Sequence, residues 1–159
     1  MHVHGQMIRR VIVVLILGAA AVAGAMLTAT SASAATTGSF VLKASVAGGI
    51  TTIQTDQTLT FVFTETNHTT AAVSEDLVLK KVANVSVTAM TCVLPNGFAI
   101  NPDSPNCEPG FVKPGKHASM VLTTTVTGAS GALASARVCL SNEANGAVGP
   151  CKTKSVPIA

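Results

Sequence analysis

The feature that most constrains the fold is a two-residue alternation of apolar and polar side chains, which recurs along much of the chain. Its clearest instance is the segment from Thr58 to Thr66, in which threonines occupy most of one side. The other side carries three large apolar residues: Leu59, Phe61 and Phe63. Successive side chains of a β-strand point to opposite faces of its sheet, so this pattern predicts a half-buried strand.

Further segments show the same alternation, and each provides one row of side chains predicted to face inward. These rows are Phe40, Leu42, Ala44 and Val46; Leu77 and Leu79; Val85, Val87 and Ala89; Ala118, Met120, Leu122 and Val126; and Ala134, Ala136, Val138 and Leu140. A final strand is expected from about Cys151 to Val156. Turn residues separate most of the rows: Gly48-Gly49, Asn67-His68, Pro95-Asn96-Gly97, Pro114-Gly115, Gly128 to Gly131 and Asn145-Gly146.

About seven short strands at this spacing predict an all-β fold, namely an immunoglobulin-like antiparallel β-sandwich with two disulfides. A small antiparallel barrel is the competing architecture. No segment after residue 34 keeps apolar residues at helical spacing for three turns.

The first 34 residues have the pattern of a secretory signal peptide. Arg9 and Arg10 precede an uncharged apolar run from Val11 to Leu27, and Ser31 to Ala34 supplies the small residues that a signal peptidase reads. A membrane anchor is the alternative, although the run is at the lower edge of the roughly 17–25 residues that span a bilayer. We therefore predict a signal peptide at 1–34 and a single secreted, extracellular β-sandwich domain at 35–159. The alanine-rich signal favours a bacterial source.

All four cysteines follow the predicted signal: Cys92, Cys107, Cys139 and Cys151. An exported protein meets an oxidising compartment, so two structural disulfides are expected. Four cysteines permit three pairings, and proximity favours Cys92–Cys107 and Cys139–Cys151. The absence of C-x-x-C spacing argues against a zinc site and against a redox site.

Charge and composition argue against several classes of ligand. Without Arg9 and Arg10, eight of the ten basic residues remain against seven acids, so no basic stripe is expected to attract nucleic acid or an anionic membrane. Trp and Tyr are absent, which argues against a carbohydrate-binding module.

No catalytic constellation is recognisable, so we predict that the protein is not an enzyme and needs no cofactor and no metal. His68 and His117 lie beside turns without a nucleophile pattern, and Glu75-Asp76 is the one adjacent pair of acids. A calcium site at Asn101, Asp103 and Glu108 is conceivable, but the spacing lacks the D-x-D-x-D-G pattern.

Three segments suggest a family. Leu59 to Asn67 reads as a strand that ends in an Asn turn, Cys107 to Lys116 as a loop leading to a Pro-Gly turn, and Gly131 to Leu133 is followed by Ala136 to Val138. With these segments, the stretch from about Thr58 to Leu140 resembles bacterial extracellular repeat domains of the DUF11 or CARDB type. The resemblance implies an immunoglobulin-like sandwich that acts as a stalk, spacer or adhesion module, and it transfers no catalytic residues. Such repeats normally stand in tandem, whereas this chain has one copy.

The leading hypothesis is therefore a secreted, non-enzymatic module with a structural or interaction role at the cell surface or outside the cell. Its partner would be an unidentified protein or a component of the cell envelope, and no stable membrane anchor would remain after signal cleavage. One alternative is a small-ligand carrier similar to chromoprotein apoproteins, with a cleft lined by Phe61, Phe63, Phe98 or Phe111. Another is a protease inhibitor that presents a loop such as Pro102 to Pro109.

Overall fold

The computed structural model describes residues 40–102, 104–142 and 145–159, so the predicted signal peptide lies outside the described residues. The described residues form ten strands and one short 3-10 helix, and they contain no α-helix. The bounds are β1 Phe40–Val46, η1 Ala47–Gly49, β2 Thr58–Asn67, β3 Val73–Ala83, β4 Val85–Val93, β5 Ala99–Ile100, β6 Asn106–Cys107, β7 Phe111–Val112, β8 His117–Val126, β9 Leu133–Asn142 and β10 Val148–Pro157.

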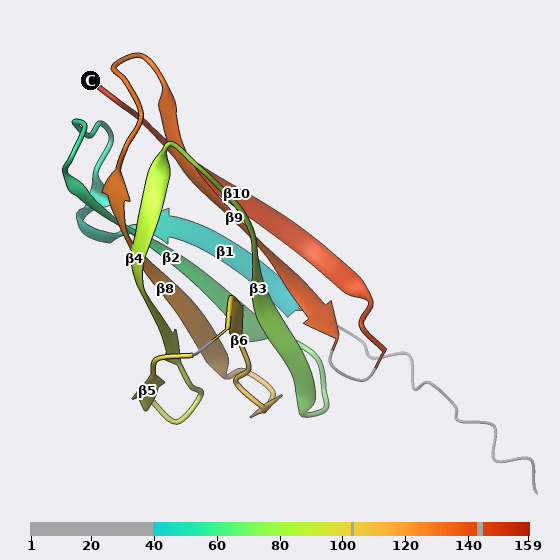
Figure 1. Ribbon diagram of the computed structural model, residues 1–159. Helices are drawn as coiled ribbons and strands as arrows, with labels where there is room; N and C mark the ends of the chain where they lie inside the picture. The colour runs from blue at the N-terminus through green and yellow to red at the C-terminus, as the bar shows by residue number, and fades with distance from the viewer. Residues whose placement is uncertain (1–39, 103, 143–144) are drawn as a thin grey trace, which may run out of the picture. The chain divides into compact units, whose positions relative to one another are not determined.

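The strands build two antiparallel sheets that face each other (Figure 1). The first sheet has the order β1-β2-β8-β4-β5 and the second has the order β10-β9-β3-β6, with β7 paired to the beginning of β3. The seven long strands thus reproduce the immunoglobulin constant-type arrangement, in which strands A, B, E and D face strands G, F and C. The predicted sandwich is confirmed, and the barrel alternative is wrong because the two sheets remain separate.

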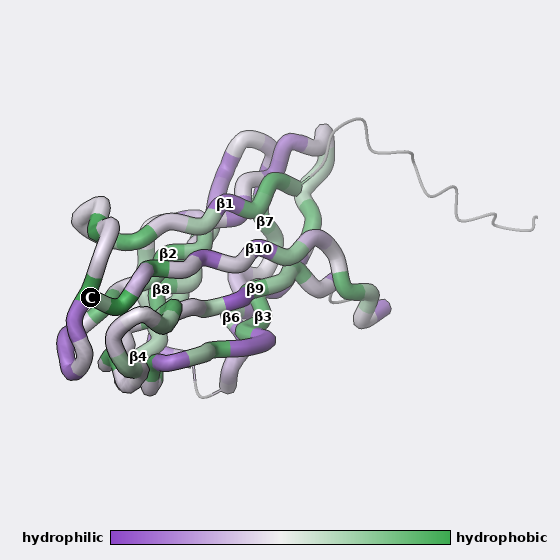
Figure 2. The backbone as a smooth tube through the Cα atoms, turned by 90° about the horizontal axis from the view of Figure 1, so that it is seen from above, coloured by the Kyte–Doolittle hydropathy of each residue, from purple (hydrophilic) through white to green (hydrophobic). Residues whose placement is uncertain are grey.

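The core lies between the sheets and is built from the predicted inward rows. Along the strands in Figure 2 apolar and polar residues follow one another, as a sheet with one buried face requires. The rows of β1, β2, β8 and β9 supply most of the buried apolar side chains. The largest fully buried ones include Leu59, Phe61 and Phe63 of β2, Met120, Leu122 and Val126 of β8, and Val138 and Leu140 of β9.

The prediction for β4 is wrong over half of the strand. Val85 is buried as expected, but Val87 and Ala89 are exposed, and Met90 and Cys92 face the core in their place. The pairing of β4 with β8 shifts register between Val87 and Ala89. A bulge inserts one extra residue into a strand, so the side chains after it change face.

The chain passes from the second sheet to the first at Asn84, a turn that the sequence analysis did not identify. Asn84 adopts a left-handed conformation with φ of 56°, which asparagine tolerates better than most residues. Its carbonyl oxygen accepts hydrogen bonds from the backbone N–H groups of Thr127 (2.9 Å) and Gly128 (3.3 Å). A Cβ atom at Gly128 would lie 2.5 Å from the Cβ of Asn84, so only glycine fits beside this crossing.

The two disulfides have the favoured pairing and occupy different positions. Cys92–Cys107 connects β4 of the first sheet to β6 of the second sheet, and both cysteines are fully buried. Cys139–Cys151 connects two directly opposed residues of the neighbouring strands β9 and β10. The first disulfide therefore joins the sheets, whereas the second reinforces one sheet.

This difference yields a prediction about local stability. Replacing both Cys92 and Cys107 by alanine should lower the free energy of unfolding by about 3 kcal/mol, measured by urea denaturation, because each disulfide closes a loop of similar length. The matched Cys139→Ala/Cys151→Ala variant should lose a similar amount. Native-state hydrogen exchange should separate the two variants, because only the first should lose protection in β5, β6 and β7. Equal loss of protection there in both variants would contradict the assignment.

Candidate functional site

Residues 94–102 and 104–116 belong to the connection between β4 and β8, and the end of the domain that they form is called the loop end here. It contains β5, β6 and β7. The connections β2–β3 and β9–β10 turn at this same end, because β2 and β9 finish opposite the beginnings of β8 and β3. In immunoglobulin variable domains, binding loops project from one end of the sandwich in a comparable way.

Large apolar side chains are exposed on the loop end. Phe98 is 70% exposed, Phe111 is 75% exposed and Ile100 is 44% exposed. In β7, Val112 is fully buried against the domain, so strand alternation directs its neighbour Phe111 outward. Phe98 lies in a tight turn closed by a hydrogen bond from the Leu94 N–H to the Phe98 carbonyl oxygen (2.8 Å). The ordered backbone at each position therefore accounts for the exposure of both rings.

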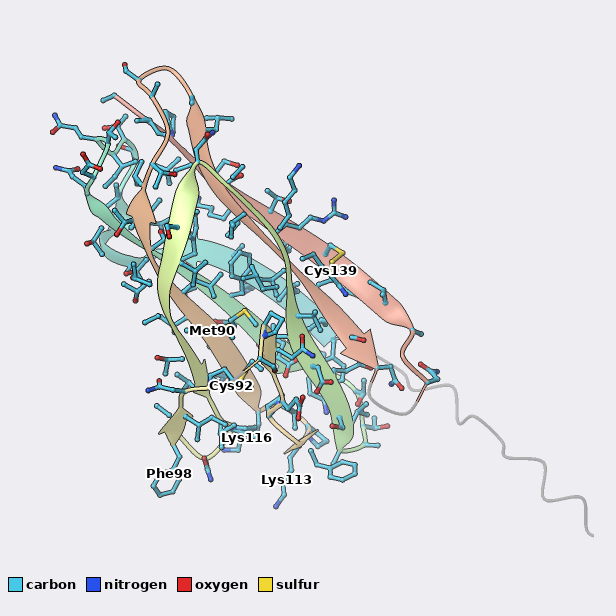
Figure 3. The ribbon with its side chains drawn as sticks, in the orientation of Figure 1. Met90, Cys92, Phe98, Lys113, Lys116 and Cys139 are labelled. Carbon is cyan, nitrogen blue, oxygen red and sulfur yellow. A yellow bond between two sulfur atoms is a disulfide. The ribbon has the colours of Figure 1, made fainter. Side chains whose placement is uncertain are left out.

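A hollow of about 440 Å³ lies at the loop end. Its lining is apolar and cationic: Leu94, Pro95, Asn96, Pro109, Phe111, Lys113 and Lys116. None of these described lining residues is acidic. Figure 3 shows Phe98 and Lys113 projecting from the same end of the domain, with Lys116 nearby.

The buried side chain of Asn67 holds this end in place. Its Nδ2 donates hydrogen bonds to the carbonyl oxygens of Val112 (2.7 Å) and Ala71 (2.8 Å), and its Oδ1 accepts one from the Thr69 N–H (2.7 Å). Its backbone accepts a hydrogen bond from Gly115 (2.8 Å) and donates one to Lys116 (3.0 Å). One residue at the end of β2 thereby fixes both β7 and the turn that follows it.

That turn presents the two lysines. The Lys116 N–H donates to the Lys113 carbonyl oxygen (3.0 Å) across Pro114-Gly115, and Gly115 has φ of +73°. Proline followed by a positive-φ glycine is the pattern of a type II turn. The predicted Pro114-Gly115 turn is therefore present, and it places Lys113 and Lys116 on either side of a rigid tip.

The histidines and the conceivable calcium ligands lie on the surface wherever the structure describes them. His68 and His117 are exposed, as expected of residues beside turns. Of the conceivable calcium ligands, Asn101 and Glu108 are exposed, and Asp103 lies outside the described residues. Over the described ranges, no group of three or more His, Cys, Asp or Glu side chains is arranged to hold a metal ion. Among the same residues, no helix is long and apolar enough to cross a bilayer.

The cleft envisaged for a ligand carrier is not formed by the four phenylalanines. Phe61 and Phe63 are fully buried in the core, whereas Phe98 and Phe111 are exposed on the loop end. The expectation of a cleft lined by Phe61 or Phe63 is therefore wrong, because the alternation of β2 commits both rings to the space between the sheets, whereas Phe111 lines the hollow at the loop end. Part of the proposed inhibitor loop belongs to a sheet, since Asn106 and Cys107 pair with β3 as β6.

Sequence reasoning missed a buried acid. Glu65 is 0% exposed, and neither of its carboxyl oxygens has a hydrogen-bond partner among the described residues. Burial, followed by the negative charges of Glu75 and Asp76, raises the pKa of Glu65 to about 8. The signal was available, because Glu65 and Asn67 continue the inward row of β2 at two-residue spacing. Because Glu65 is closed off from solvent, it has no access to a substrate in this structure.

No protein-family model and no curated protein matches the chain. Similar solved structures include BcpA, the major pilin subunit of Bacillus cereus, at 11% identity and a TM-score of 0.49, covering 76% of this chain and 40% of the pilin. A CARDB domain from Pyrococcus furiosus in complex with di-metal ions has 9% identity and a TM-score of 0.45, over 76% of this chain and 93% of the domain. AvmM, which catalyses macrocyclization in alchivemycin A biosynthesis, has 10% identity and a TM-score of 0.48, over 74% and 88%. Such values assign neither a family nor a function to this chain.

The role of Asn67 can be tested by substitution. Asn67→Ala should lower the free energy of unfolding by about 2–4 kcal/mol, since it removes the side-chain hydrogen bonds to the buried Val112 carbonyl oxygen and the buried Thr69 N–H. Chemical denaturation measures this loss. The exposed Asn96→Ala variant, in which the Phe98 N–H loses its bond to Asn96 Oδ1, should cost much less. Equal losses in both variants would contradict an organising role for Asn67.

The buried acid predicts a dependence of stability on pH. From about pH 5 to about pH 8 the unfolded chain releases the Glu65 proton, whereas the folded chain retains it because its pKa is about 8. The free energy of unfolding should therefore fall as pH rises through this window, with a limiting slope of about 1.4 kcal/mol per pH unit, and level off above it. Urea denaturation across the window should show the fall in the wild type and a flatter profile in Glu65→Gln. The control Glu108→Gln, at an exposed position, should keep the wild-type slope, and identical profiles in all three proteins would contradict the assignment.

Proposed function

We propose that the protein is an exported, non-enzymatic immunoglobulin-like module that binds its partner through the loop end. In this proposal residues 1–34 are a signal peptide that is removed, and residues 35–159 form the mature extracellular domain. The two disulfides agree with an oxidising compartment. The proposal includes the finer assignment to the bacterial extracellular repeat type, with a structural or adhesive role at the cell envelope.

The observation that carries the proposal is the exposure of Phe98 and Phe111 on a rigid frame. Large apolar side chains that are exposed together at one end of a domain favour an interaction site there, because water solvates them poorly. Here the frame is fixed by the Cys92–Cys107 disulfide and by the hydrogen bonds of Asn67. A pre-ordered surface loses less conformational entropy on binding than a flexible one does.

The chemistry of the surface favours binding over catalysis. Its side chains are aromatic rings, prolines and lysines, which supply apolar contact and positive charge. The acid with the strongly raised pKa, Glu65, is buried inside the sandwich and is not part of this surface.

Affinity capture from the cell envelope and culture medium of the producing organism tests the proposal. The Phe98→Ser/Phe111→Ser variant should retain a captured component at least about tenfold more weakly than the wild type, since each exposed ring contributes up to about 1.5–3 kcal/mol when buried. Leu133→Ser is the matched control, because Leu133 is 53% exposed at the opposite end of the sandwich. Equal capture by all three proteins would contradict a binding role for the loop end.

A further inference from the structure

We infer that the partner of the loop end is an anionic lipid bilayer surface, on which the domain docks peripherally and reversibly. This inference rests on the proposed function and names the partner class for the same surface. It involves no membrane-spanning segment and no covalent anchor.

The apolar side chains have the arrangement that a fluid surface accommodates. Phe98 belongs to the turn between β4 and β5, and Phe111 belongs to β7, so the two rings come from separate tips of the loop end. Both protrude, being 70% and 75% exposed, and Phe98 is not part of the hollow that Phe111 lines. A folded partner would need two matching pockets at a fixed spacing, whereas the interfacial region of a bilayer accepts both rings without preformed pockets.

The charges beside Phe111 are complementary to anionic headgroups. Lys113 and Lys116 flank the Pro114-Gly115 tip and line the hollow together with Phe111. Glu108, an acid of the same segment, lines a separate hollow with Ile100, Asn101 and Pro102. The two lysines therefore adjoin Phe111, whereas Glu108 adjoins Ile100. Basic residues near an anionic leaflet strengthen peripheral binding, and added salt screens that contribution.

The same charges argue against a second copy of the chain as the partner. Tip-to-tip association around a two-fold axis would bring Lys113 and Lys116 of one copy against the same residues of the other. Repulsion between these lysines would oppose the apolar contact, whereas a surface rich in phosphate groups satisfies the lysines and the rings together.

Two rings and two lysines imply weak, reversible binding. A single buried acyl chain gives marginal membrane association, and two phenylalanines bury an apolar area of that order or smaller. Binding should consequently depend on both the apolar contact of the rings and the electrostatic attraction of the lysines. Loss of either contribution should reduce the affinity strongly.

The test is cosedimentation of the mature, oxidised protein, as its producing cell exports it, with two kinds of lipid vesicle. One kind contains phosphatidylcholine alone, and the other also contains phosphatidylglycerol. We expect binding to the second kind, weaker binding to the first, and a decrease as sodium chloride is added. Phe98→Ser and Phe111→Ser should each weaken binding about tenfold or more, and Lys113→Gln/Lys116→Gln should remove the preference for phosphatidylglycerol.

Matched control variants distinguish a specific role of the loop end from a general effect of removing apolar area or positive charge. Leu133→Ser removes an exposed apolar side chain at the other end, and Lys80→Gln/Lys81→Gln removes two exposed charges from β3; both should bind as the wild type does. Circular dichroism confirms that each variant is folded. Absence of binding to phosphatidylglycerol vesicles, or binding that the loop-end variants do not reduce, would overturn the inference.

The outcomes also distinguish this inference from the proposed function. If vesicles are not bound but a protein or wall component is captured in a manner that requires Phe98 and Phe111, the lipid inference fails and the interaction role of the loop end stands. If the loop-end variants change neither vesicle binding nor capture, both fail.

Discussion

The inward row of β2 is the element on which the rest of the structure depends. This strand lies between β1 and β8 in the first sheet, and its alternate residues from Leu59 to Asn67 are all buried against the second sheet. The row changes character along its length, from Leu59 and two phenylalanines to Glu65 and finally to Asn67. The apolar part builds the core. The polar part reaches the loop end, where Asn67 orders β7 and the turn that follows it, and where burial raises the pKa of Glu65.

The alternation predicts which side chains are buried wherever a strand is regular, but it fails where pairing with a neighbour decides the geometry. In β4 the predicted inward row held only at Val85, because the bulge against β8 is set by pairing with the partner strand and not by the alternation within β4. The crossing at Asn84 had a local signal, since asparagine accepts left-handed geometry, but a lone asparagine between two apolar rows is ambiguous. The strands β5, β6 and β7 have two residues each, which is too short for an alternation of apolar and polar residues to be recognised. The Cys92–Cys107 disulfide and Asn67 hold this region in place.

The exposed surface at the loop end could not be predicted from the sequence for a related reason. Net charge is an average over the chain, and a nearly balanced total gave no reason to expect positive charge at any one place. A tight turn brings Lys113 and Lys116 to the same hollow as Phe111. Composition likewise could not distinguish the buried phenylalanines from the exposed ones. The alternation of β2 does place Phe61 and Phe63 in the core. Phe98 and Phe111 stand in a segment rich in proline and glycine, where no period assigns a face.

The cost of burying Glu65 and the stabilisation by the two disulfides have comparable sizes. The domain therefore depends on its cysteines being oxidised. Retaining the proton on buried Glu65 costs, near pH 8, on the order of 5 kcal/mol relative to an unshifted carboxyl group. Each disulfide contributes about 3 kcal/mol, and a domain of this size has about 5–15 kcal/mol in total. The two disulfides together therefore offset the buried acid. Because Cys92–Cys107 also joins the sheets next to the loop end, one of the two crosslinks that together offset the acid also helps to keep the exposed rings in a fixed arrangement. The proposed weak binding would depend on that arrangement, since any ordering of the loop on binding would subtract from a small total affinity.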